Sequence, residues 1–100
     1  EPILTDVTMS DADRSGISRV FDKTISTQMF AVGVSVEKMK KELTEEINSA
    51  DLVISKGMGN FEALSDSSIN PILYLFRAKC NPVAKAAGVI KNDNVAKLVL

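Results

Sequence analysis

The sequence predicts an α/β fold with a largely parallel sheet, and three observations favour it. Short apolar runs of strand length alternate with helical patterns along the chain. Two of these runs, at 51–57 and 71–79, are almost continuously apolar, as in strands of a sheet that is covered on both faces. Capping residues, glycines and prolines separate the strand-like runs from the helical patterns.

The expected strands share a short apolar run that is bounded by polar or turn-forming residues. They lie at 2–7, 20–27, 51–57, 71–79 and 94–100. The clearest helix is expected at 35–50, because Val36, Met39, Leu43 and Ile47 fall on one helical face with lysines and glutamates opposite.

Three shorter helices are predicted from the residues at their ends, where a polar side chain can cap the first turn. They lie at 8–16, 60–66 and 81–88, with Thr8 or Ser10, Asn60 and Asn81 as the expected caps. Gly16 is expected to stop the first of them. The stretch 28–34 carries no readable pattern.

Composition excludes several classes of protein. One hundred residues indicate one domain, and a net charge of −1 argues against a dedicated nucleic-acid binder. No apolar run is long enough to predict a membrane span. The lone Cys80 cannot form an internal disulfide, so we expect a cytoplasmic protein. The chain begins at Glu1 with a strand-like run, and we interpret it as a fragment of a longer protein.

Polar residues follow three of the expected strands. Because ligands gather at the carboxyl ends of parallel strands, these residues are expected to converge on one edge of the sheet. The three groups are Asp6, Thr8 and Asp11; Ser55, Lys56, Gly57, Gly59 and Asn60; and Arg77 and Lys79.

The segment "SKGMGN" at 55–60 has the composition of a phosphate-binding corner. Gly57 and Gly59 would let successive backbone N–H groups point into one concavity, and a helix that follows would add its free amides. Lys56 would add a full positive charge. The segment lacks the order of a nucleotide P-loop and the third glycine of a dinucleotide fingerprint. The alternative is a tight strand-to-helix turn without a ligand.

Two further residues have a functional and a structural interpretation. Asp6 could hold a hard divalent cation, but an aspartate there could equally cap a helix. Lys79 could neutralise charge on a phosphoryl group in transfer, or it could be a solvated lysine at a strand end. Cys80 is interpreted as a small buried apolar group, because the sequence has no histidine to act as its base.

Three segments together resemble a known family. "LTDVTMSDA", "ADLVISKGMGNFEALSD" and "LFRAKCNPVAKAAGV" are similar to the carboxyl-terminal part of the metal-dependent damage-control phosphatases, formerly domain of unknown function 89, in their archaeal and bacterial branch. The resemblance covers nearly the whole chain. It implies a three-layer, Rossmann-like α/β/α domain of which residues 1–100 are the carboxyl-terminal part. It also implies one divalent metal ion (Mg, Mn, Co or Ni) and hydrolysis of phosphate esters of small metabolites.

The resemblance also implies roles for particular residues. The aspartate of the Asp-x-Thr segment, here Asp6, ligates the metal. The Lys-Gly segment, here Lys56, Gly57 and Asn60, lines the phosphate and substrate pocket. Lys79 contacts the phosphate.

The sequence departs from the family pattern in two places. The Asp-Asn metal motif that lies upstream in the family has no match here, which favours a truncated domain that is inactive by itself. Gln28 follows Thr27 where the family often has a glycine.

Our leading hypothesis is therefore the carboxyl-terminal portion of a metal-dependent phosphatase, with Asp6 and Lys79 in the catalytic site and Lys56, Gly57, Gly59 and Asn60 around the phosphate. The expected partners are a small phosphorylated metabolite and the missing amino-terminal part of the same protein, without nucleic acid or membrane. Two alternatives stay open: a non-catalytic module that binds a phosphorylated ligand, and an inert structural fragment.

Overall fold

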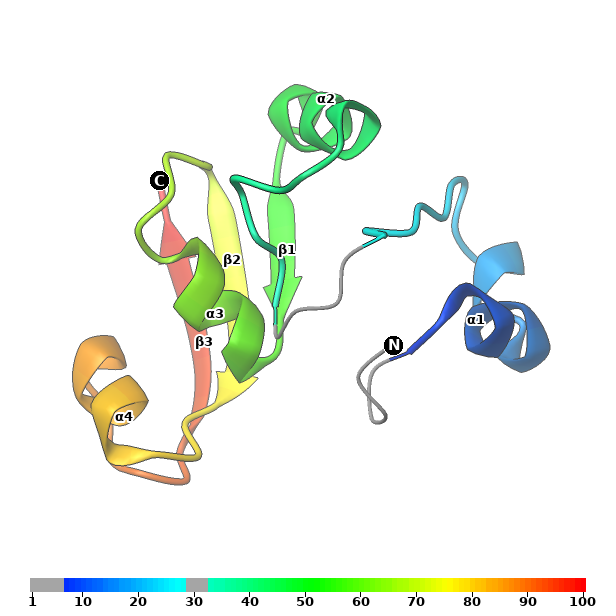
Figure 1. The fold of residues 1–100 in the computed structure, drawn as a ribbon. Coiled ribbons are helices and arrows are strands. Elements are labelled where there is room, and N and C mark those ends of the chain that lie inside the picture. The colour runs from blue at the N-terminus through cyan, green and yellow to red at the C-terminus, as the bar shows by residue number, and fades with distance from the viewer. Residues whose placement is uncertain (1–6, 29–32) are drawn as a thin grey trace.

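The computed structural model describes residues 7–28 and 33–100 and has an α/β fold (Figure 1). Its elements, in chain order, are α1 (Met9–Ser15), the 3-10 helix η1 (Ile17–Arg19), α2 (Lys41–Ser49), β1 (Val53–Lys56), α3 (Met58–Leu64), β2 (Ile72–Arg77), α4 (Asn81–Ala87) and β3 (Asn94–Val99). The predicted strand at 2–7 falls almost entirely outside the described residues. None of the helices in the described ranges is long and apolar enough to cross a membrane.

The sheet has the order β1-β2-β3 and is mixed. β1 pairs with β2 in parallel, as predicted, but β3 pairs with β2 in the antiparallel direction. After α4 the chain returns to the carboxyl end of β2. There the N–H of Ala78 donates to the carbonyl of Asp93 at 2.9 Å, and the N–H of Asn92 donates to the carbonyl of Ala78 at 2.6 Å. β3 therefore begins beside the end of β2, where Asn94 is opposite Arg77.

One face of the sheet carries the hydrophobic core, and α3 and α4 cover it (Figure 1). Alternate residues of β2 point into this core, and the most deeply buried of them, Ile72, is 1% exposed. Phe61 of α3 stacks on Phe76 with ring centroids 4.4 Å apart and meets Tyr74 edge-on at 5.1 Å. The period-two pattern of β2 and the apolar side of α3 thus account for this packing.

The opposite face of the sheet is open. It is apolar except at the carboxyl end of β2, where Lys56, Arg77 and Asn94 lie. Ile54 of β1 is 61% exposed and Leu98 of β3 is 54% exposed, and Leu75 of β2 lies on the same face. Within the described residues there is one layer of helices against the sheet, not the two layers of a three-layer arrangement. The α/β class is confirmed at this level.

The first helix follows its predicted limits. The hydroxyl of Thr8 accepts the backbone N–H of Asp11 at 3.2 Å, and the Asp11 carboxylate accepts the backbone N–H of Thr8 at 3.0 Å, which is a capping box. Gly16 ends the helix with φ +81°. α1 lies apart from the sheet in Figure 1.

Four local predictions were wrong, three of them at the start of a helix. The segment 20–27 forms no strand, and Val20 and Phe21 are exposed, because β propensity does not hold a strand without a paired neighbour. The helix predicted at 35–50 begins only at Lys41, after a turn. Asn60 does not cap α3, since the helix starts two residues earlier and Gly57 occupies the cap position.

Asn81 is likewise not the cap of α4. It is the first residue of the helix, Cys80 occupies the cap position and Pro82 follows as the second helical residue. Gly88 ends the helix in the left-handed conformation, with φ +73°, as expected for a glycine just past a helix.

Candidate functional site

The parallel pairing of β1 and β2 places Lys56 and Lys79 at the same edge of the sheet. Lys56 is the last residue of β1, and Lys79 follows β2 by two residues. The backbone N–H of Gly57 donates to the carbonyl of Leu75 at 2.9 Å, which holds the two strand ends together. The N–H of Lys79 lies 3.4 Å from the sulfur of Met58, the first residue of α3. This carboxyl edge is where the sequence predicted the site.

Gly57 turns the chain from strand to helix in one residue. It has φ +96° and ψ 153°, a conformation that is essentially restricted to glycine. Its carbonyl accepts the N–H of Phe61 at 3.2 Å and so begins α3. A Cβ added to Gly57 would meet no atom of residues 7–28 or 33–100 within 4 Å, so these residues leave the space in front of it open. Gly59 lies within α3, and the bend therefore needs one glycine instead of the predicted two.

The first amides of α3 belong to Met58, Gly59 and Asn60. The first N–H groups of a helix have no carbonyl of their own helix to donate to, and they can serve an anion. The N–H of Gly57 is already used in the sheet, so it is not one of these donors.

The side-chain amide of Asn60 is engaged inside the protein. Its nitrogen donates to the carbonyl of Lys56 at 2.8 Å, and its oxygen accepts the backbone N–H of Val34 at 3.0 Å. Neither partner was expected from the sequence. The prediction that Asn60 contacts a phosphate stays untested, with one N–H of the amide left for such a contact.

Gly33 is a residue of this region that sequence reasoning missed. It has φ +75°, and a Cβ built on it would lie 2.8 Å from the carbonyl carbon of Gly59 and closer still to the carbonyl oxygen. A side chain at this position would therefore strike the first turn of α3. The sequence shows a glycine within 28–34, a stretch without a helix or strand pattern. Its contact residue, Gly59, lies 26 residues away in sequence and could not be identified from the pattern.

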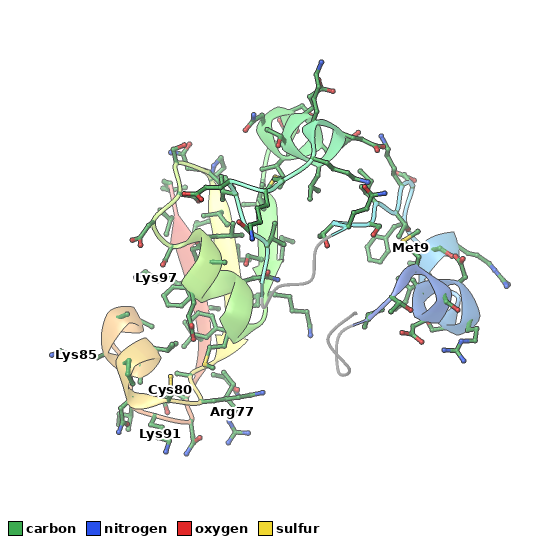
Figure 2. The ribbon with its side chains drawn as sticks, in the orientation of Figure 1. Met9, Arg77, Cys80, Lys85, Lys91 and Lys97 are labelled. Carbon is green, nitrogen blue, oxygen red and sulfur yellow. The ribbon has the colours of Figure 1, made fainter. Side chains whose placement is uncertain are left out.

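Other charged groups gather at the same edge. Figure 2 shows Arg77, Cys80 and Lys91 at one end of the molecule. The Arg77 Nε donates to the carbonyl of Asn92 at 3.2 Å, which joins the end of β2 to the turn before β3 and gives this arginine a structural role. Lys91 was not singled out from the sequence, and the nearby Asp93 carboxylate accepts the N–H of Ile90 at 3.3 Å. Within the described residues, Lys56, Lys79 and Lys91 form no ion pair.

Cys80 is half-buried and packs against the core formed by the sheet, α3 and α4. This placement agrees with its interpretation as a small apolar group. Ser55, the residue before Lys56, is buried on the helix-covered face of β1, and its hydroxyl has no hydrogen-bond partner among the described residues.

Asp11 has a capping role. Its carboxylate accepts hydrogen bonds from the backbone and hydroxyl of Thr8 and pairs with Arg14, and these contacts hold the pKa of Asp11 below its usual value. Asp6, the predicted metal ligand, lies outside the described residues. In residues 7–28 and 33–100 no cluster of three or more histidine, cysteine, aspartate or glutamate side chains is placed to hold a metal.

A cavity of about 650 Å³ lies elsewhere, between the segment 35–39, α2 and the chain that follows α3. It is near the amino ends of β1 and β2, because α2 leads into β1 and the chain after α3 leads into β2. Its lining includes the carboxylates of Glu37 and Asp66, which would repel a phosphate. The cavity is therefore a poor candidate for the predicted site, and the carboxyl edge stays the better one.

The chain is similar in sequence to a family model and to several archaeal proteins. The model of the damage-control phosphatase ARMT1-like domain matches residues 1–95. A damage-control phosphatase of Archaeoglobus fulgidus is 39% identical over 98% of this chain. A damage-control phosphatase of Pyrococcus horikoshii is 41% identical over 90% of it, and an uncharacterized protein of Methanocaldococcus jannaschii is 43% identical over 95% of it.

A crystal structure of a DUF89 family protein from Pyrococcus horikoshii superposes on 97% of this chain with a TM-score of 0.89 and 39% identity. The chain covers 34% of that structure, and 34%, 32% and 31% of the Archaeoglobus, Methanocaldococcus and Pyrococcus relatives. It thus spans about a third of the length of the proteins that it matches. With nearly its whole length matched by the family model, the chain belongs to the damage-control phosphatase ARMT1-like domain family.

Proposed function

We propose that this chain supplies the phosphate-binding edge of a metal-dependent phosphatase that hydrolyses phosphate esters of small metabolites, such as sugar phosphates or damaged phosphometabolites. The observation that carries the proposal is the meeting of Lys56, Gly57 and Lys79 at the carboxyl edge of a parallel strand pair. Such an edge is where α/β proteins bind their ligands. The names of the Archaeoglobus and Pyrococcus relatives support the reaction class.

The chemistry of this edge suits a phosphoryl group. Among the described residues, Lys56 and Lys79 have no anionic partner and nothing fills the space in front of Gly57. In phosphate hydrolysis negative charge is spread over the oxygens of the group in transfer, and catalysis depends on cations and amides that are already in place. Lys79 would contact that charge, while Lys56 and the amides of 58–60 would hold the ester.

The metal is a further part of the proposal. A bound divalent ion, Mg, Mn, Co or Ni, would polarise a phosphate oxygen and a water molecule. The described residues do not supply a ligand set, so from this chain only Asp6 is proposed as a ligand. The other ligands would come from the remaining two thirds of the family domain.

We also propose that residues 1–100 are the carboxyl-terminal part of one three-layer, Rossmann-like domain. The open apolar face of the sheet and the match to a third of each relative support this arrangement. In it, the missing part would cover the open face. A cytoplasmic location, suggested by the lone Cys80, and a small phosphorylated metabolite as the partner belong to the same proposal.

The proposal can be tested with Lys79→Met in the intact protein that carries this segment. The change removes the charge but keeps an apolar stem. With p-nitrophenyl phosphate and added Mg, Mn, Co or Ni, we expect kcat/KM to fall on the order of 100-fold with unchanged thermal unfolding. Lys85→Met on α4 is the matched control and should keep the wild-type kinetics.

Two results would contradict parts of the proposal. Wild-type kinetics in a folded Lys79→Met protein would place Lys79 on the solvated surface. An intact protein that binds phosphate esters but turns none of them over with any of the four metals would support a non-catalytic binding module.

A further inference from the structure

The side chain of Asn60 connects three segments of the chain. From its place in the first turn of α3 it reaches back to the end of β1 and across to the segment that begins at Gly33. In Figure 1 this segment runs beside α3 toward α2. We propose that Asn60 is a positioning residue that fastens residues 33–35 to the β1–α3 turn, so that this segment forms one wall of the phosphate-binding edge. The inference rests on the proposed function and adds a structural requirement to it.

The two hydrogen bonds of Asn60 use opposite ends of one rigid amide. The nitrogen binds the carbonyl of Lys56 at 2.8 Å, and the oxygen accepts the N–H of Val34 at 3.0 Å. The bond to Lys56 fixes the peptide group that precedes the Gly57 turn. The bond to Val34 ties a segment 26 residues upstream to the same turn. One planar group therefore couples the position of the segment to the geometry of the corner.

Gly33 provides a second, independent observation. It packs so closely on the carbonyl of Gly59 that any side chain would displace the segment from α3. A hydrogen bond to Val34 and a close approach at Gly33 fix two neighbouring residues of the segment. The segment is thus held at the first turn of α3, next to Gly57 and Lys56.

The amide chemistry allows the two bonds to be separated. Asn60→Asp keeps an oxygen for the N–H of Val34 but sets a carboxylate oxygen against the carbonyl of Lys56. Asn60→Leu keeps the approximate shape and loses both bonds. Asn94→Leu is the control, since Asn94 is exposed on β3 and its side chain makes no hydrogen bond within the described residues.

The first test is amide hydrogen exchange at Val34 in the intact protein. We expect Asn60→Leu to raise the exchange rate of this amide at least tenfold, and Asn60→Asp and Asn94→Leu to leave it within a factor of about three. Equal exchange of Val34 in wild type and Asn60→Leu would overturn the proposal. This measurement needs no enzymatic activity, so it remains decisive for the fastening if the phosphatase function fails.

The second test asks whether the segment matters to the site. Gly33→Ala leaves the amide of Asn60 in place but forces the segment away from Gly59. Gly88→Ala is its matched control, because Gly88 also has a positive φ, +73°, but an added Cβ there meets none of the described atoms within 4 Å. We expect Gly33→Ala to lower kcat/KM for p-nitrophenyl phosphate at least tenfold, and Gly88→Ala to lower it less than threefold.

The double variant separates positioning from direct contact. If Asn60 acts through the segment, Gly33→Ala combined with Asn60→Leu should be no worse than the poorer single variant, because both remove the same arrangement. If Asn60 instead binds the phosphate itself, Gly33→Ala should behave like Gly88→Ala and the two effects should multiply. The second pattern would overturn the positioning role. Should Asn60→Leu fail to fold, Asn60→Ala, which also removes both hydrogen bonds, carries the same comparison with Gly33→Ala.

Discussion

The two faces of the sheet differ in what covers them, although both are apolar over most of their length. On one face Ile72, Tyr74 and Phe76 are buried under α3 and α4. On the other face Ile54 and Leu98 are more than half exposed. A sheet that faces water on one side normally carries polar residues there. We therefore expect the open face to be covered in the intact protein, as proposed above.

The exposed apolar side chains of the open face are a candidate surface for contact with another part of the protein. Contiguous exposed apolar surface marks a place of contact with another part of a protein or with another molecule. The match to about a third of each relative agrees with such a contact within a larger family domain. The comparison of the two faces can be tested by substitution on each.

The largest effect is expected on the covered face. Phe61→Ala removes a ring that contacts both Phe76 and Tyr74, and should lower the free energy of unfolding by about 3–5 kcal/mol through lost burial and a cavity. Urea unfolding of the chain measures this loss. A loss below about 1 kcal/mol would mean that α3 does not form the core of this fragment.

A smaller effect is expected on the open face, and it should depend on context. In the 100-residue chain, Leu98→Ala should cost less than about 1 kcal/mol, because most of the side chain is already in water. In the intact protein that carries this segment, the same change should cost about 2–5 kcal/mol if the face is buried there. Equal, small losses in the two proteins would show that the missing part does not cover this face.

The smallest effect concerns pH. Burial on the covered face raises the pKa of the Tyr74 phenol above its ordinary value of about 10. The folded state therefore holds this proton more tightly than the unfolded state, and the resulting stability is complete below pH 10 and lost as the pH rises beyond it. Tyr74→Phe should lose less stability than wild type between about pH 9 and 11. Parallel unfolding curves for the two proteins over this range would contradict the buried position of the phenol.

Part of the site was predictable because it depends on short-range rules. Lys56 and Gly57 end one apolar run, and Lys79 lies just past the next. When two neighbouring strands are parallel, the residues at their carboxyl ends lie at the same edge, and these three residues do so. The partners of Asn60 were not predictable. Asn60 was interpreted from its neighbours in sequence, whereas the N–H that its oxygen binds belongs to Val34.

The same division applies to the fold. Local chemistry specified α1 between Thr8 and Gly16, because a capping box and a left-handed glycine act within one helical turn. The apolar runs similarly specified β1 and β2. The direction of β3 was decided by the hydrogen bonds of Ala78 with Asn92 and Asp93, which return the chain to the end of β2. The conformation of 20–27 was decided by the lack of a paired neighbour within the described chain. Strand pairing and the close approach of Gly33 to α3 join residues far apart in sequence, and only the folded arrangement brings such partners within reach.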